Sequence, residues 1–268
     1  MRKSLTTYIL TITLLSSLTD ASEESFSPPQ MIKLQPLPTK YAQTSNYESI
    51  KIKGIEILLS PKVTLNKQLK AKTIKRLSVQ IASAQRLLPI AKLKALKPIR
   101  IWVEFNARES GYAEYHAYQD WLQENDYNPE KYKGIEITNI ANYLKWSSRD
   151  PLISSVLIHE IAHAYYHALN QDDKNKVQTA YNNVKKQNLY RNVYRLGTSQ
   201  HGVPIIIDKA WALEDEWEYF SELTEAVFAK NDYFPHTSKE LEKYDPNGYI
   251  VVKSLWNKIA MIKNNEES

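Results

Sequence analysis

The sequence contains no cysteine, and this absence excludes several kinds of chemistry. No disulfide can form, so the hydrophobic core must hold the fold without covalent cross-links. A cysteine nucleophile, a thiolate-bound zinc ion and an iron–sulfur cluster are excluded as well. A metal ion in this chain would therefore need histidine, aspartate or glutamate as ligands.

Glycine is scarce, and neither sign of charge dominates. With 6 glycines in 268 residues, the chain has no GxGxxG, P-loop or GxSxG motif. Lys and Arg number 35 against 30 Asp and Glu, and the basic residues stand in short groups beside acidic ones. This pattern is typical of solvated helix faces rather than of a nucleic-acid groove, so we expect no nucleic-acid partner.

Long apolar runs are absent except near the start of the chain. Residues 1–21 combine basic Arg2 and Lys3, an apolar stretch from Tyr8 to Leu18, and the small residue Ala21. This is the pattern of a secretory signal peptide, and the apolar stretch is shorter than the ~20 residues that span a bilayer. The sequence predicts export to the periplasm or the extracellular space, with no stable membrane insertion; a retained anchor is the alternative.

The rest of the sequence indicates an arm followed by one α+β domain. Residues 22–45 hold four prolines and few periodic apolar positions, which predicts an extended arm. Strand-like segments come early in the domain (46–268) and helical ones late. We expect strands at 49–60, 99–105 and 133–138, helices at 65–88, 172–187 and 215–229, and an irregular stretch around Gly197 and Gly202. Helix starts are predicted at Asp150-Pro151, at a capping box from Thr237 to Glu240, and at Asp245-Pro246.

The segment VLIHEIAHAYYH, residues 156–167, carries the main chemical signal. It contains the pattern HExxH, in which His159 and His163 are four residues apart. On a helix they share one face about 6 Å apart, so their imidazoles can bind one metal ion. Glu160 lies about 100° round the helix from His159, within reach of a metal-bound water without binding the metal itself.

The third ligand has to come from another element. His167 is about 12 Å of helix rise from His159, too far for both to bind one ion. The downstream helix at 215–228 offers Glu218 and Glu222, which are i and i+4 and so on one face. From spacing alone, either of them could be a ligand, or the helix could simply expose its acids to solvent. His116 is expected to be a packed or hydrogen-bonded residue.

Four segments together resemble a known family. They are HEIAHAYYH (159–167), EYFSELTEAVFAKNDYFP (218–235), KELEKYDPNGY (239–249), and the upstream segment at 115–146 with its YHxxxxWL and GIEI parts. The chain is similar here, over roughly residues 100–256, to zinc metallopeptidases with a catalytic domain like that of anthrax lethal factor. This resemblance implies a zincin-like domain, with a small mixed sheet packed on the active-site helix and a mostly helical C-terminal part.

The resemblance also implies roles for single residues. Glu218 falls on the third zinc ligand, and Glu222 on the position that supports a zinc-bound histidine. At residue 211 the family usually has a tyrosine that steadies the developing oxyanion, but this chain has Trp211. The indole N–H of Trp211 could act as a transition-state donor, or His201 or a tyrosine could replace it, or turnover could be slow.

These observations predict an exported zinc-dependent endopeptidase. We expect Zn²⁺ to be held by His159, His163 and Glu218, with Glu160 as general base. We expect a protein or peptide substrate, bound in extended form along the sheet edge formed by the strand Ile135 to Ile137. The alternatives are a zinc-holding secreted binding protein with weak catalysis, and an amidase acting on cell-wall peptides.

Overall fold

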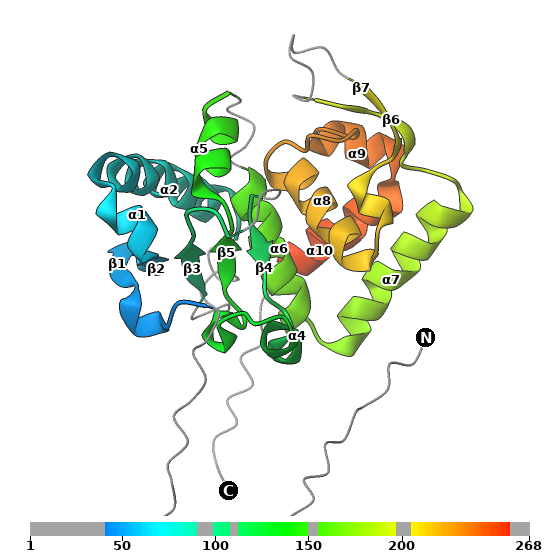
Figure 1. The fold of residues 1–268 in the computed structure, drawn as a ribbon. Helices are drawn as coiled ribbons and strands as arrows, with labels where there is room; N and C mark the ends of the chain where they lie inside the picture. Colours follow the sequence, from blue (N-terminus) through cyan, green and yellow to red (C-terminus); the bar gives the residue numbers. More distant parts are fainter. Residues whose placement is uncertain (1–40, 90–98, 108–111, 150–154, 197–204, 258–268) are drawn as a thin grey trace, which may run out of the picture. The chain divides into compact units, whose positions relative to one another are not determined.

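Five strands form a mixed sheet in the computed structural model of the chain (Figure 1). The structure describes residues 41–89, 99–107, 112–149, 155–196 and 205–257. The strands are β1 (Glu48–Ile52), β2 (Ile55–Leu59), β3 (Arg100–Val103), β4 (Glu114–Tyr115) and β5 (Ile135–Ile137). Their spatial order is β1-β2-β3-β5-β4. The three central strands run parallel, and β1 and β4 are antiparallel at the two edges.

The segment predicted as one strand at 49–60 is a hairpin of two strands. Lys53 and Gly54 form its turn, with φ angles of 48° and 85°. Both lie in the left-handed region, which two-residue hairpin turns require, and glycine adopts it without cost. Ile52 consequently pairs with Ile55 directly across the turn.

The predicted edge strand is wrong. Ile135 to Ile137 lie in β5, which is hydrogen-bonded to β3 on one side and to β4 on the other. The three residues are buried, as expected for an internal strand. The edge beyond β5 is β4, which is only two residues long and lacks β-branched residues, so that its sequence gives no strand signal.

One face of the sheet packs against helices α2 (Lys67–Leu87) and α6 (Ser155–Ala168). Alternate strand residues such as Ile57, Ile101 and Ile135 share one buried cluster with Ile81 of α2 and Ile158 of α6. Side chains on alternate positions of a strand point to the same face, which explains this selection. Two further helices, α1 (Pro61–Leu65) and α5 (Ile140–Arg149), pack against α2.

The later part of the described chain is mostly helical. Its elements are α7 (Gln171–Lys186), the hairpin of β6 (Arg191–Arg195) and β7 (Ile205–Lys209), α8 (Glu216–Phe228), α9 (Ser238–Tyr244) and α10 (Pro246–Asn257). Strands β6 and β7 lie on either side of the stretch around Gly197 and Gly202 that was predicted to be irregular, and both glycines are outside the described residues. No helix in the described ranges is long and apolar enough to cross a membrane.

Several predicted helix starts are confirmed. Thr237 and Glu240 form a reciprocal capping box at the start of α9, and α10 begins at Pro246. The predicted cap at Asp150 lies outside the described residues, as do the signal segment 1–21 and the arm up to residue 40. The remaining short elements are α4 (Gln119–Glu124) and turns of 3-10 helix at Thr44–Asn46, Pro129–Lys131 and Trp211–Leu213.

A buried carboxylate joins α8 to α10. Asp245 is 3% exposed, and its Oδ2 accepts hydrogen bonds from the hydroxyls of Tyr219 at 2.6 Å and Tyr190 at 2.9 Å. Its Oδ1 accepts a hydrogen bond from the backbone N–H of Gly248. A Cβ atom on Gly248 would lie 2.3 Å from both Asp245 Oδ2 and the Tyr219 hydroxyl, so only glycine fits there.

We therefore expect Gly248→Ala to destabilise the fold. Helix propensity alone favours alanine by up to about 1 kcal/mol, but overpacking costs about 1–3 kcal/mol and disturbs the Asp245 hydrogen bonds. Urea denaturation should show a net loss of stability. Gly54→Ala is the matched control, since no atom lies within 4 Å of its Cβ and only the left-handed φ opposes it. Unchanged or raised stability of Gly248→Ala would contradict the close packing described here.

Candidate metal centre

The packing of α6 against α8 brings three potential ligand atoms together. His159 Nε2 lies 3.0 Å from both His163 Nε2 and Glu218 Oε2. His163 Nε2 lies 3.5 Å from the same carboxylate oxygen. The first turn of α8 is fixed by its N-cap, because Asp215 Oδ1 accepts hydrogen bonds from the backbone N–H groups of Trp217 and Glu218. The structure thus places together the three residues that were expected as ligands from the sequence.

The donor set fits a zinc ion. Nitrogen and oxygen ligands about 2.0–2.2 Å from a tetrahedral zinc are roughly 3.4 Å apart, close to the spacing of these three atoms. Two imidazoles and one carboxylate from the protein leave one position open, as in catalytic rather than structural zinc sites. His159, His163 and Glu218 could therefore hold the metal.

The outer nitrogen of His159 contacts a different carboxylate from the one predicted. His159 Nδ1 lies 2.7 Å from Glu225 Oε1, whereas Glu222 Oε1 is 3.8 Å away. The supporting role was assigned to Glu222, and the structure gives the hydrogen bond to Glu225, seven residues after Glu218. All three acids lie on one face of α8, and the rotation of the helix decides which of them meets the imidazole.

The pKa of His159 depends on the carboxylates of Glu218 and Glu225. Burial disfavours the charged imidazole, but hydrogen bonds to Glu218 and Glu225 raise the pKa of His159 well above its ordinary value. Burial would likewise raise the pKa of Glu218, yet the hydrogen bonds with His159 and His163 lower it. A divalent cation between the ligands would take over the charge balance that the His159 proton provides, and its binding would release that proton.

Glu222 differs from Glu218 and Glu225 on α8 in its hydrogen bonding and in its pKa. It is 4% exposed, and its Oε2 has no hydrogen-bond partner among the described residues. Burial, followed by the nearby charge of Glu225, raises the pKa of Glu222 well above its ordinary value. The neutral form of this carboxyl is therefore favoured, and it adds no second negative charge behind His159.

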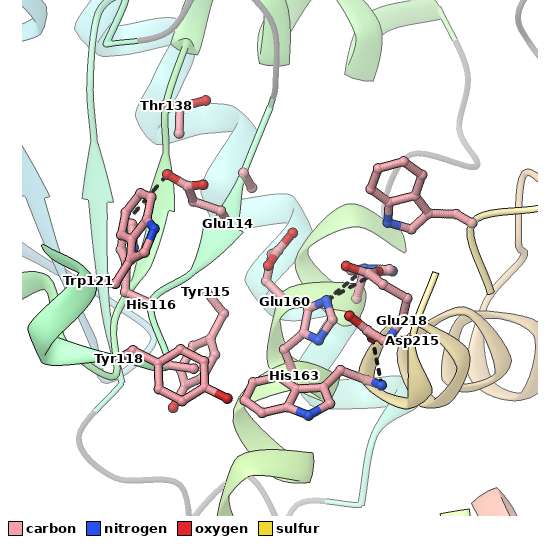
Figure 2. A pocket seen from close by; sticks show the side chains of 15 residues that line it. Glu114, Tyr115, His116, Tyr118, Trp121, Thr138, Glu160, His163, Asp215 and Glu218 are labelled. Carbon is pink, nitrogen blue, oxygen red and sulfur yellow. Dashed lines mark hydrogen bonds and ion pairs between the residues drawn. The ribbon is translucent and has the colours of Figure 1, made fainter. Parts of the chain in front are cut away.

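Glu160 lies beside the three potential ligands, and all four side chains line one cavity (Figure 2). Its volume is about 590 Å³. Its side chain comes from α6, one position after His159, and is 6% exposed. Burial raises the pKa of the Glu160 carboxyl to about 8, although the charge of His159 acts in the opposite direction. A cation at the ligand position would lower this pKa, which suits a group that has to accept a proton near neutral pH.

Aromatic side chains form much of the remaining wall. Trp211 is 49% exposed and lines the cavity from the short 3-10 helix before α8. Trp217 stacks on His167, with ring centroids 6.0 Å apart. The ring Nδ1 of His167 is 3.0 Å from the hydroxyl of Tyr115, so this histidine joins α6 to the edge strand β4 instead of binding the ion.

The opposite wall carries a chain of buried hydrogen bonds. His116 Nε2 lies 2.7 Å from Glu136 Oε2, and Lys131 Nζ lies 2.7 Å from Glu136 Oε1 and 2.9 Å from Glu104 Oε1. Tyr47 donates its hydroxyl to the same Glu104 oxygen. Burial would raise the pKa of Glu136, but the hydrogen bond with His116 and the charge of Lys131 lower it. The expectation that His116 is a packed, hydrogen-bonded histidine is confirmed, and its partners, which lie on separate segments, were not predicted.

No family model, no curated protein and no solved structure matches this chain.

The geometry leads us to expect that Glu225 supports metal binding more than Glu222 does. Glu225→Gln removes a charged acceptor from His159 Nδ1, and such supporting contacts are typically worth 10–100-fold in metal affinity. Glu222→Gln should change the affinity little, because that carboxyl is favoured neutral and stands 3.8 Å from the imidazole. Titration of the metal-free protein with zinc against a chelator of known affinity measures both.

His159→Ala and His163→Ala provide the reference for complete loss of zinc in the same titration. Circular dichroism of each variant checks that the fold persists. A larger effect of Glu222→Gln than of Glu225→Gln would restore the assignment made from the sequence.

Proposed function

We propose that this chain is an exported zinc-dependent endopeptidase with a zincin-like catalytic domain. The observation that carries the proposal is the convergence of two helical imidazoles and the Glu218 carboxylate next to the buried Glu160, all on one open cavity. The HExxH pattern predicts this constellation, and the fold brings its third member from a helix about 55 residues later. The resemblance of the four segments to lethal-factor-like peptidases supports the same function.

The proposed reaction assigns separate tasks to the residues. His159, His163 and Glu218 would hold the zinc ion, which supplies Lewis acidity that polarises the scissile carbonyl and makes a water molecule acidic near neutral pH. The Glu160 carboxylate accepts the proton of the attacking water and passes it to the leaving amine. His159 is kept in orientation by Glu225, since its Nδ1–H donates to that carboxylate.

The sheet edge that would bind an extended substrate is β4 rather than β5. One side of β4 is paired to β5 through Glu114 and Tyr115, and its other side has no neighbouring strand in the described sheet. An added peptide strand could therefore hydrogen-bond to its backbone. Because Glu114 and Tyr115 line the same cavity as Glu160, a peptide paired to β4 would pass the proposed catalytic group.

A zinc-holding binding protein with weak turnover is the rival proposal, and Trp211 is the observation that favours it. The indole occupies the position of the family's tyrosine, and it donates through a less acidic N–H. Trp211 does line the cavity and is half exposed, so its side chain is accessible to a bound substrate. The two proposals share the metal site and differ only in turnover.

Glu160→Gln tests the proposed catalysis directly. The amide has nearly the same shape but cannot accept the proton, so peptide hydrolysis should fall about 10²- to 10⁴-fold while zinc binding persists. Hydrolysis is measured on a proteome-derived peptide library by the appearance of new amino termini. His163→Ala serves as the control that loses zinc and activity together. Hydrolysis at the wild-type rate in Glu160→Gln would remove this residue from the mechanism.

Trp211 provides a separate test of oxyanion stabilisation. If its indole donates to the developing oxyanion, Trp211→Phe should lower kcat by up to about 10²–10³, the scale for one lost donor. Trp211→Tyr restores the family's residue and should keep or raise kcat. Absence of hydrolysis in both the wild type and Trp211→Tyr, with zinc bound, would favour the binding protein over the enzyme.

A further inference from the structure

One residue of the edge strand β4, Tyr115, contacts helix α6 at two points. Its hydroxyl oxygen lies 3.0 Å from Nδ1 of His167, and the two rings meet edge to face with centroids 5.9 Å apart. Its backbone N–H donates a hydrogen bond to the carboxyl of Glu160. Glu160 and His167 are about two turns apart on α6, so they lie on the same side of the helix. Figure 2 shows Tyr115 and Glu160 lining the same cavity.

The pairing of β4 with β5 explains why the N–H of Tyr115 points to α6. The next residue, His116, donates its N–H to the carbonyl oxygen of Gly134, and its own carbonyl accepts from the N–H of Lys133. In a paired strand, the backbone groups of successive residues point to opposite sides. The N–H of Tyr115 therefore points away from the β5 side, to the edge where Glu160 lies.

The hydrogen bond from Tyr115 limits the orientations open to Glu160. Within the described ranges, the Glu160 carboxyl takes part in one hydrogen bond, and Tyr115 is the donor. A carboxylate has two oxygens, so one can accept this N–H while the other accepts a proton. A general base must lie about 2.6–3.2 Å from the heavy atom that loses the proton. Because a glutamate side chain has several rotatable bonds, a fixed N–H donor is a direct means of holding the carboxylate at this distance.

His167 is a fixed anchor for the hydroxyl of Tyr115. Trp217 of α8 stacks on its imidazole, with ring centroids 6.0 Å apart and ring planes inclined by 25°. Burial lowers the pKa of His167, and the charges of Lys133 and Lys174 act in the same direction. Burial raises the pKa of the Tyr115 hydroxyl. At neutral pH the tyrosine therefore keeps its proton, and the neutral imidazole can accept a hydrogen bond from it at Nδ1.

We propose that Tyr115 and His167 are positioning residues for Glu160 in the proposed peptidase reaction. β4 is paired to β5 through only two residue pairs, and a ladder of this length is not stable by itself. The hydrogen bond between Tyr115 and His167 holds β4 against α6, and the N–H of Tyr115 then orients the Glu160 carboxylate toward the attacking water. The inference rests on the proposed function, and it adds two residues that act without contact with the reacting atoms.

Tyr115→Phe is the variant that removes the hydroxyl contact alone. It keeps the ring and the backbone N–H, so the edge strand loses only its hydrogen bond to His167. In the zinc-loaded full chain, kcat for a quenched fluorescent peptide that the wild type cleaves should fall about 10- to 100-fold, since a displacement of about 1 Å can cost 10²-fold. KM and zinc affinity should stay as in the wild type, because the potential zinc ligands are untouched and the hydroxyl is engaged with His167 rather than with the substrate.

The same result is expected from the other partner of the hydrogen bond. His167→Phe removes the ring nitrogens and keeps an aromatic ring against Trp217, so kcat should fall as it does in Tyr115→Phe. His167→Asn places an amide oxygen near the position of Nδ1 and should recover part of the lost kcat. In Glu160→Gln, adding Tyr115→Phe should not lower the remaining kcat further, because the effect passes through Glu160.

Tyr165→Phe is the matched control, because Tyr165 also lies on α6 and donates its hydroxyl, to the carbonyl oxygen of Leu255 at 2.7 Å. Tyr165 is not among the described residues that line the cavity. Both variants lose one hydroxyl hydrogen bond, so their melting temperatures should fall by similar amounts, and only Tyr115→Phe should lower kcat. An unchanged kcat in Tyr115→Phe, with a lower melting temperature, would show a purely structural contact and overturn the inference.

The amide resonance of Tyr115 tests the contact without turnover. In the zinc-loaded chain, isotope-labelled at its tyrosine nitrogens, this resonance is the one that is missing in Tyr115→Phe. Glu160→Gln should move it upfield, because a neutral acceptor makes a weaker hydrogen bond than a carboxylate. His167→Phe should move it in the same direction, whereas Tyr165→Phe should leave it in place.

Other results would contradict the positioning role. A raised KM at unchanged kcat would assign Tyr115 to substrate binding, and a loss of zinc in His167→Phe would assign His167 to the metal. If the wild type hydrolyses peptides while His167→Phe changes neither kcat nor the Tyr115 resonance, the inference fails and the proposed function stands. If the resonance moves as expected in a chain that hydrolyses nothing, the contact between β4 and Glu160 stands and the proposed function fails.

Discussion

The hydrogen bonds of the His159 imidazole to two carboxylates of α8 are the interaction on which the proposed site depends. One ring nitrogen faces Glu218 and the other faces Glu225, so a single side chain of α6 contacts two turns of α8. Buried charges are costly unless they are paired, and here the acids on the inner face of α8 are tolerable because the imidazole lies between them. The contacts of His159 with Glu218 and Glu225 thus allow these charged groups to be buried between α6 and α8. The same contacts bring the three potential ligand atoms together.

The position of α8 is fixed at its first turn by two sets of contacts. Asp215 caps the first turn and thereby fixes the backbone of Glu218. Tyr219, one residue later, is tied through its hydroxyl to Asp245 at the start of α10, where Gly248 allows close approach. The hydroxyl of Tyr219 reaches Asp245 on the side of α8 that faces the later helices, whereas Glu218 reaches His159 of α6. A change near Asp245 would therefore reach the candidate metal centre through the rotation of α8, without touching any of the three potential ligands.

The sequence predicts those features of the fold and the candidate site that depend on neighbouring residues in the chain. It does not predict features that depend on how separate elements pack. The HExxH spacing and the capping box at Thr237 are properties of one turn of helix, and both segments are helical as expected. The choice between Glu222 and Glu225 is not local, because both acids lie on the inner face and only the rotation of α8 against α6 decides which one reaches His159. The strand β4 was missed for a related reason, whereas β7 begins with three isoleucines, which are a local strand signal. β4 is held by pairing to β5 rather than by its own two residues, and tertiary context overrides weak strand propensity.

The edge strand β4 links the two halves of the cavity. A ladder of two residue pairs is too short to be stable by itself, so side chains must hold β4 in place. On the side of α6, the Tyr115 hydroxyl contacts His167, the third histidine of that helix. On the other side, His116 contacts the buried chain of Glu136, Lys131 and Glu104. His167 is too distant to bind a metal with His159, and His116 belongs to a different wall, yet together they set the distance between the sheet edge and the proposed catalytic group. His116 and His167, which are not among the potential ligands, thus position the sheet edge along which the proposed peptide substrate would lie.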